Sequence, residues 1–316
     1  MTLNKKVNFF HLFGDKGGTG LGCIALEPLE AGEVILKVPF EDCVWPIDES
    51  EDQFKNLLIS LKRVYLDSNN KWFDYLDNIH KSGSLNDLPV MSGQVCGTSS
   101  VSNLFKILVS PYLDDSTIPN WLVALGLSRC FDSECRSEGI AFVPFADQFN
   151  HSTPNWNTRL REEDDHFIFY AERRIEANEE ILNNYGIDTT VEMWTTHGFI
   201  DDGLIEDIIY IPLSFLRESD ILNEDEEDVI LKINVNSKEV IPNEIKELFV
   251  LKDFLPKVAD CLIRAMDRMV SDNSGSSSND VILNRILVKD KSNCLLYRKR
   301  LVEYRENLDY QSFLFL

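Results

Sequence analysis

The chain has 316 residues, of which 44% are hydrophobic, and a formal net charge of −22. This length allows one large domain or two ordinary ones, and the hydrophobic content is enough for a packed core, which excludes a disordered protein. No run of about eighteen apolar residues occurs, so we expect neither a membrane span nor a membrane partner. The negative field disfavours direct nucleic-acid binding and favours encounter with basic proteins, although the charge could instead serve solubility alone.

The seven cysteines are scattered along the chain and form no CxxC pair. This pattern is typical of free thiols in a reducing compartment, and we expect no bound metal. The N-terminal residues lack the apolar core and the small-residue cleavage site of a signal peptide. We therefore expect a cytoplasmic protein, with the nucleus as a second candidate compartment.

The N-terminal part is predicted to be β-structure broken by turns. A glycine-rich loop is expected over residues 14–22. Short strands follow at residues 23–25 and 34–38, and a turn over residues 30–32 is expected to join them as a hairpin. The loop lacks both the GxGxxG spacing and the Gly-Lys-Ser/Thr ending of phosphate-binding loops. The glycines on either side of Leu21 would let backbone groups approach a ligand closely, although an ordinary flexible turn is the simpler interpretation.

Apolar residues recur at helical spacing in several segments after residue 45. Helices are expected over these segments: residues 51–66, 72–79, 99–109 and 120–129. The last helix ends on Arg129, and residues 85–98 are interpreted as a loop. We therefore expect residues 46–120 to form a helical insertion between two β-rich parts.

Two polar clusters follow apolar segments at positions about thirty residues apart. The first, at the end of residues 142–152 (FVPFADQFNHS), presents the amide of Asn150 and the imidazole of His151 just before a turn. The second ends an alternating strand on Tyr185, where the following glycine lets the backbone bend beside the phenol. A further strand is predicted between them at residues 166–171. We expect the clusters at the ends of neighbouring strands, where they would form a site for a polar ligand.

The composition changes after residue 201, which we take as a domain boundary. The chain is acidic up to residue 228, and helical patterns resume from Pro242. Residues 272–280 have the composition of a flexible link, and residues 281–308 are predicted to form an amphipathic helix. Four apolar residues of that helix are expected to be available for burial: Leu295, Leu296, Leu301 and Tyr304.

Conventional hydrolytic chemistry finds little support in the sequence. There is no GxSxG elbow and no HExxH, and the five histidines show no metal-ligand spacing. What remains is an Asn-His pair, a tyrosine at a strand end, a Gly-Leu-Gly segment and an arginine that closes a helix. These groups could hold a polar cofactor and align a reaction that needs little acid–base catalysis.

Four motifs in this order resemble those of the SET-domain methyltransferases, and most closely the branch typified by the Rubisco large-subunit lysine methyltransferase. The motifs are GTGLGCIALEPLEAGEVILKVP (residues 18–39), LSRCF (127–131), VPFADQFNHS (143–152), and NYG (184–186) followed by EMWTTHGF. The resemblance covers roughly residues 14–200. It implies an α+β protein: a β-rich SET domain in two parts, residues 1–45 and 121–200, with a helical insertion at 46–120 and a smaller, mostly α-helical substrate-binding domain at 201–316.

The resemblance also implies that the chain binds S-adenosylmethionine. Tyr185 corresponds to the catalytic tyrosine of the family. Arg129 corresponds to the arginine that reaches the cofactor carboxylate, a charge-assisted contact, although it could instead pair with Asp132 or Glu134. The implied cofactor-binding residues are Thr19, Gly20, Leu21, Gly22, Arg129, Asp147, Asn150, His151, Tyr185, His197 and Phe199.

The implied function is a protein-lysine N-methyltransferase that acts on a non-histone protein, such as a ribosomal protein or a translation factor. A basic protein would be the partner, and a monomer is assumed. Methyl transfer from a sulfonium mainly requires alignment. The lysine must first lose a proton, starting from a pKa of about 10.4, and an apolar channel lowers that value.

Three alternatives remain at this point. The first is a protein-histidine N-methyltransferase, since a relative in this branch modifies histidine. The second is a catalytically silent SET-fold binding module, because Thr19 stands where this branch often has a glutamate; retention of Asn150, His151 and Tyr185 favours an active enzyme. The third is an unrelated mixed α/β ligand-binding protein, which would require the order of the motifs to be a coincidence.

Overall fold

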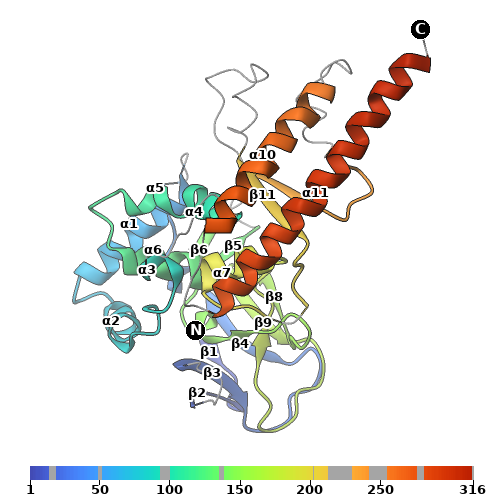
Figure 1. Ribbon diagram of the computed structural model, residues 1–316. Helices are drawn as coiled ribbons and strands as arrows, with labels where there is room; N and C mark the ends of the chain where they lie inside the picture. The colour runs from blue at the N-terminus through green and yellow to red at the C-terminus, as the bar shows by residue number, and fades with distance from the viewer. Residues whose placement is uncertain are drawn as a thin grey trace. The chain divides into compact units, whose positions relative to one another are not determined.

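The structure is a computed structural model (Figure 1). The chain divides into two compact units. The structure describes residues 1–13, 19–48, 52–92, 100–134, 139–201, 203–212, 230–241, 255–275 and 281–314. The first unit comprises residues 1–93, 112–187 and 196–204, and the second comprises the rest of the chain. Both units are discontinuous in sequence, and the four expected domain ranges stay a prediction. None of the helices in the described ranges has the length and apolar character needed to cross a membrane.

A four-stranded antiparallel sheet with the order β1-β4-β9-β8 lies at the centre of the first unit. Its strands are β1 (Thr2–Leu3), β4 (Val34–Pro39), β9 (His166–Ala171) and β8 (Thr158–Glu163). The turn between β8 and β9 consists of Asp164 and Asp165, which have φ angles of 50° and 58°. Positive φ at both central residues is what a two-residue type I′ hairpin requires. The strand predicted at residues 166–171 is confirmed as β9.

The other described strands of the first unit pair in twos. The pairs are β2 (Val7–Phe13) with β3 (Thr19–Ala25), β5 (Cys130–Ser133) with β6 (Gly139–Phe142), and β7 (Asn150–His151) with β10 (Leu182–Asn183). The first two pairs are antiparallel, whereas β7 and β10 are parallel.

Two expectations for the N-terminal part are wrong. Thr19 to Gly22 lie in strand β3 rather than in a loop, because they pair with β2 in regular register; residues 14–18 lie outside the described residues. The strands on either side of residues 30–32 do not pair with each other, because β4 pairs instead with β1 and β9. The predicted turn itself is present: the Glu33 N–H donates to the Glu30 carbonyl, and Gly32 has a φ of 81°.

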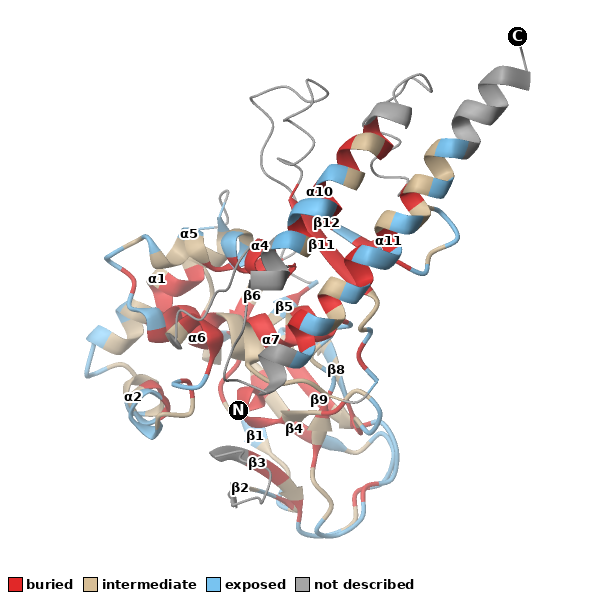
Figure 2. Ribbon diagram, viewed as in Figure 1, coloured by how far each residue is buried: buried red, intermediate tan, exposed pale blue. Residues whose placement is uncertain are grey.

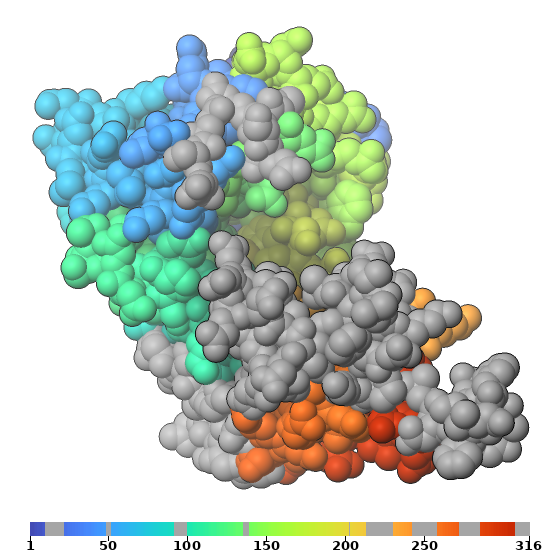
Figure 3. All heavy atoms as spheres, turned by 90° about the horizontal axis from the view of Figure 1, so that it is seen from above, coloured from blue at the N-terminus to red at the C-terminus, as the bar shows by residue number. Residues whose placement is uncertain are grey.

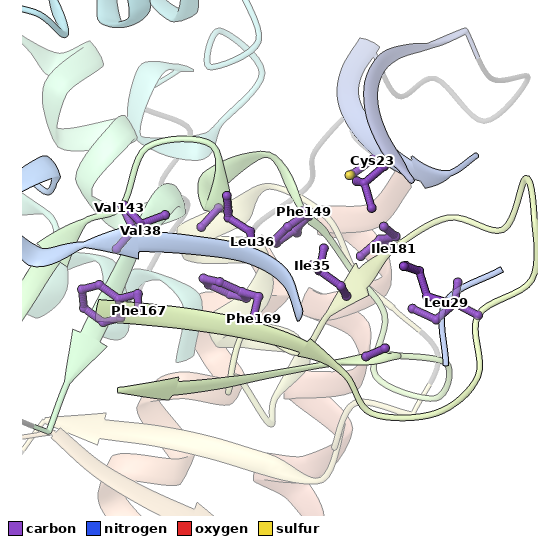
Figure 4. Close-up of a cluster of buried hydrophobic side chains, with 14 of the residues drawn as sticks. Cys23, Leu29, Ile35, Leu36, Val38, Val143, Phe149, Phe167, Phe169 and Ile181 are labelled. Atoms are coloured by element: carbon purple, nitrogen blue, oxygen red, sulfur yellow. The ribbon is translucent and has the colours of Figure 1, made fainter. Parts of the chain in front are cut away.

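The core of the first unit is formed by side chains of β4 and β9 together with residues that lead into the two polar clusters (Figure 4). The buried residues labelled there are Cys23, Leu29, Ile35, Leu36, Val38, Val143, Phe149, Phe167, Phe169 and Ile181. Full burial of one large aliphatic or aromatic side chain stabilises a fold by about 1.5–3 kcal/mol. Phe149 directly precedes Asn150, and Ile181 directly precedes β10, so this core anchors the start of both clusters.

Helices of the first unit include α1 (Gln53–Leu66), α2 (Phe73–Ser82), α3 (Pro89–Ser92) and α6 (Asn120–Arg129). The helices predicted at 51–66, 72–79 and 120–129 are thereby confirmed, whereas α3 lies inside a predicted loop. α1 begins where the Asp52 side chain accepts a hydrogen bond from the Lys55 N–H, 2.8 Å long, as an N-cap residue does. α2 ends at Gly83, which has the left-handed conformation common at helix ends.

The second unit contains α4 (Ser100–Leu108), β11 (Ile208–Pro212), β12 (Ile230–Asn234), α10 (Leu255–Gly275) and α11 (Val281–Leu314). α10 and α11 pack against each other and appear side by side in orange and red in the space-filling view (Figure 3). Both helices bury one side and expose the other (Figure 2). The helix predicted at 99–109 is confirmed as α4, and the antiparallel pair β11–β12 was not expected.

The burial predicted on helix α11 is confirmed for Leu301 and, in part, for Tyr304, which packs against the core of the second unit, but it is wrong for the other two residues. Leu301 is buried, but Leu295 and Leu296 are 48% and 41% exposed. The buried stripe instead includes Asp290 and Asn293, which are each 2% exposed. These polar side chains have partners inside the unit, so they occupy positions that a hydrophobicity pattern assigns to solvent.

Candidate cofactor and catalytic site

The parallel pairing of β7 and β10 brings the two polar clusters together. Asn150 lies opposite Leu182, and His151 lies opposite Asn183. Two residues beyond β10, the Tyr185 N–H donates to His151 Nδ1 over 3.1 Å, and the two rings lie 4.9 Å apart between centroids. The prediction that the clusters lie at the ends of neighbouring strands is confirmed.

The Tyr185 hydroxyl is held by the backbone just before β7. It donates to the carbonyl oxygen of Phe149 over 2.9 Å. Burial raises the pKa of Tyr185 to about 12. The phenol is therefore neutral near pH 7, and it can orient a polar group but not act as a strong base.

The imidazole of His151 is fully enclosed, with a side-chain exposure of 0%. Its Nε2 lies 2.9 Å from Thr153 Oγ1 and 3.6 Å from Asp201 Oδ2. Because Nδ1 accepts from the Tyr185 N–H, the ring proton is assigned to Nε2. Burial lowers the pKa of His151, which favours the neutral ring although Asp201 opposes the shift.

Asn150 is tied to the segment that runs beside the glycine-containing strand. Its Nδ2 donates to Glu180 Oε1 over 2.7 Å. Glu180 forms a β-bridge with Ile24 on β3, and the next N–H, of Ile181, donates to the Cys23 carbonyl over 2.7 Å. The end of the Gly-Leu-Gly strand therefore lies next to the segment that holds Asn150.

Arg129, the last residue of α6, has an acidic partner that neither sequence alternative named. Its Nη1 donates to the Asp147 backbone carbonyl over 2.9 Å and to Asp147 Oδ2 over 3.3 Å. The Asp147 side chain is 0% exposed, and burial raises its pKa although Arg129 opposes the shift. Among the described residues, the buried Nε of Arg129 has no hydrogen-bond partner. A guanidinium with a spare buried donor fits the carboxylate of an amino-acid-like cofactor.

His197 and Phe199 complete an aromatic wall beside Tyr185. The ring centroid of His197 lies 4.8 Å from that of Tyr185, and that of Phe199 lies 6.1 Å from the His151 ring. Burial, followed by the nearby His151 and Arg129, lowers the pKa of His197 to about 3. Gly198 between them has a φ of 75°, a conformation that favours glycine. Two neutral imidazoles therefore flank the phenol.

The SET-domain family model matches residues 20–186, which is more than half of the chain. The chain belongs to the SET-domain family. The motif order, the α+β architecture and the clustering of the Asn-His pair with the strand-end tyrosine are all consistent with this membership.

Solved structures share the fold of this SET-domain chain at low sequence identity. The SET domain of LSMT bound to lysine and AdoHcy has a TM-score of 0.60 at 16% identity and covers 98% of this chain and 89% of that chain. Rubisco LSMT bound to AdoMet has a TM-score of 0.59 at 16% identity with the same coverage. Rubisco LSMT bound to sinefungin and monomethyllysine has a TM-score of 0.57 at 15% identity, again with 98% and 89% coverage. A search of curated proteins by sequence found no match.

The SET domain brings most of the predicted site residues into one region. Those whose side chains are described there are Arg129, Asp147, Asn150, His151, Tyr185, His197 and Phe199. Thr19, Gly20 and Leu21 are placed by their backbone on β3, and Gly22 is buried on the same strand. The individual cofactor contacts of all these residues stay predictions.

Three polar residues of this region were not predicted from the sequence. Asp201 lies next to His151, Glu180 accepts from Asn150, and Tyr75 donates to Asp147. Glu180 lies in a charged segment just before β10 and Tyr75 lies in helix α2, so neither stands out in the sequence. Within the described ranges, no cluster of three or more His, Cys, Asp or Glu side chains is placed to hold a metal ion.

Proposed function

We propose that this SET-domain protein is an S-adenosylmethionine-dependent protein-lysine N-methyltransferase that acts on a non-histone protein, such as a ribosomal protein or a translation factor. The observation that carries this proposal is the placement of Tyr185 against His151 by the parallel pairing of β7 and β10. The proposal is also supported by the solved structures that share this fold, which contain AdoMet, AdoHcy, lysine or monomethyllysine.

In this proposal the cofactor is held by groups that the fold has already placed close together. The Arg129 guanidinium, with its buried Nε free of partners among the described residues, takes the carboxylate. Asn150 and His151 supply polar contacts, and the backbone of residues 20–22 supplies further hydrogen-bonding groups. Bound S-adenosylmethionine supplies an electrophilic methyl group next to a sulfonium charge.

The residues around Tyr185 would orient the substrate amine without taking its proton. The phenol is neutral because its pKa is about 12, so its hydroxyl acts as a hydrogen-bonding guide. His151 and His197 are also neutral, because burial lowers the pKa of both rings. Removal from water and the nearby sulfonium charge both disfavour a protonated amine, so the lysine would release its proton to solvent on entering. Alignment of the neutral amine is then the main contribution of the protein.

The test is to identify the methylated residue directly. Purified protein and S-adenosylmethionine would be added to an extract of cells that lack the protein, and new methyl marks would be mapped by mass spectrometry. We expect methyl-lysine on a basic non-histone protein. Methyl-histidine would contradict the lysine assignment, and absence of any mark despite cofactor binding would favour a silent SET-fold module.

Tyr185→Phe is the matched control for this assay, because it removes only the hydroxyl. We expect the rate of methylation to fall by about 100-fold or more, since a small loss of alignment can have that effect. Affinity for S-adenosylmethionine, measured by calorimetry, should fall by a much smaller factor than the rate does, because the ring of Tyr185 stays in place.

A further inference from the structure

We propose that Tyr75, on helix α2 of the insertion, is a positioning residue for the Arg129–Asp147 pair. This inference rests on the proposed function insofar as that pair serves cofactor binding. Tyr75 lies 72 residues before Asp147 in the chain, in a segment outside the four family motifs.

The Tyr75 hydroxyl connects three groups of one short segment. It donates to Asp147 Oδ1 over 2.6 Å. It accepts from the Phe145 N–H over 3.0 Å and from Gln148 Nε2 over 2.5 Å. One donated and two accepted hydrogen bonds use the full capacity of a hydroxyl group. All three partners lie in or directly before the 3-10 turn η2 (Ala146–Gln148), which leads into Phe149 and Asn150.

The backbone held by Tyr75 has an unfavourable conformation. Phe145 has φ and ψ angles of 71° and −35°, which non-glycine residues rarely adopt. Its ring packs on Tyr75 at 5.0 Å, on Phe9 at 5.8 Å and on Trp72 at 6.2 Å between centroids. The hydrogen bond from its N–H to Tyr75 and this aromatic packing together hold a turn that would otherwise relax.

The two oxygens of the Asp147 carboxylate have separate partners. Oδ1 accepts from Tyr75, and Oδ2 lies 3.3 Å from Arg129 Nη1. The Asp147 side chain is 0% exposed, and the Phe145 backbone also hydrogen-bonds the carboxylate, so Tyr75 holds both the carboxylate and the turn residue next to it. Burial also raises the pKa of Tyr75 well above its usual value, so the hydroxyl keeps the proton that it donates. Tyr75 therefore sets the direction of the carboxylate, and the carboxylate sets the direction of the guanidinium.

The test is a double-mutant cycle on cofactor affinity, measured by calorimetry with S-adenosylmethionine and with folding checked by circular dichroism. Tyr75→Phe keeps the ring and removes the hydroxyl, and we expect the dissociation constant to rise about tenfold. If Tyr75 acts through Asp147, adding Tyr75→Phe to Asp147→Asn should change affinity by less than about twofold. This coupling is a readout that a general loss of stability would not produce.

Tyr65→Phe is the matched control. It removes a hydroxyl from the same insertion, where the Tyr65 oxygen lies 3.0 Å from His80 Nδ1, and we expect wild-type affinity. Equal affinity of wild type and Tyr75→Phe, or independent losses in the double variant, would overturn the inference while leaving the proposed function intact. Failure of the wild-type chain to bind the cofactor would instead contradict the proposed function and, with it, this inference.

Discussion

Burial keeps the side chains of Tyr185, His151 and His197 uncharged. The pKa of Tyr185 is raised to about 12, and that of His197 is lowered to about 3. Burial also lowers the pKa of His151. A site for a sulfonium cofactor gains from this arrangement, because protonated imidazoles would repel the sulfonium charge.

The neutral state of His197 predicts a specific loss of stability in acid. Its folded-state pKa lies below the value of about 6.5 in unfolded chains. Between about pH 6.5 and pH 3 the unfolded chain therefore binds a proton that the folded chain does not, so stability falls as the pH falls. The free energy of unfolding would be measured with denaturant at about pH 7 and about pH 4.5. Between these two pH values we expect it to fall by about 2 kcal/mol more in wild type than in His197→Gln. Equal losses in both chains would show that His197 is not held neutral.

Much of the site could be predicted from short motifs, but not the contacts that orient it. Asn150, His151 and Tyr185 stand at strand ends in recognisable order, and their clustering follows from the pairing of two strands. Tyr75 reaches the site from a distant segment, whereas Asp201 follows Phe199 by two residues; a lone tyrosine or aspartate in a sequence gives no sign of such a contact. Arg129 was predicted, but its partner Asp147 was not paired with it, because the two residues meet only in the folded chain.

At the scale of elements, helix α6 packs closely on α1 through a glycine. A Cβ at Gly126 would lie 2.8 Å from Leu58 Cδ2 and 2.9 Å from Phe54 Cζ. Gly126→Ala should gain about 1 kcal/mol of helix propensity but lose about 1–3 kcal/mol through overpacking. We expect a net destabilisation of about 1 kcal/mol in urea unfolding, relieved in part by adding Leu58→Val. A net stabilisation would contradict the close packing.

In the second unit, we expect removal of the buried carboxylate of Asp290 to lower the free energy of unfolding more than Gly126→Ala does. It accepts from the Ser100 N–H over 2.8 Å and from Ser100 Oγ over 2.5 Å, at the start of α4. Asp290→Ala leaves both donors without this acceptor, and we expect a loss of about 3 kcal/mol in urea unfolding. The control is Asp267→Ala, since Asp267 forms an exposed ion pair with Arg298 and should cost less than about 1 kcal/mol. Similar losses would show that Asp290 is not a structural anchor.

Helices, whose periodicity lies within their own sequence, were predicted better than strand pairs, whose two members lie far apart in the chain. Helical periodicity located α1, α2, α4 and α6, because the pattern lies within each helix. The hairpin expected around Gly32 was wrong, because β4 pairs with β1 and with β9, which lies more than 100 residues later in the chain. The buried face of α11 was predicted only in part, because its polar members Asp290 and Asn293 find partners only through tertiary contacts.

At the scale of the whole molecule, the net charge of −22 bears on the proposed basic partner. Electrostatic attraction between an acidic enzyme and a basic protein weakens as salt screens it. We expect kcat/KM for a basic protein substrate to fall about tenfold between about 50 and 300 mM salt. The KM for S-adenosylmethionine should change by less than about twofold. If kcat/KM did not change with salt, the net charge would serve solubility alone and not substrate encounter.

The central claim is that the Asn150–His151 pair and the residues around Tyr185 form an S-adenosylmethionine site. It is tested most directly by calorimetric titration of purified protein with S-adenosylmethionine, beside an Asn150→Ala, His151→Ala double variant whose fold is checked by circular dichroism. The account predicts binding on the order of micromolar for wild type and a loss of about 100-fold or more in the variant. Absence of binding to the folded wild-type chain, or equal binding by the double variant, would contradict it.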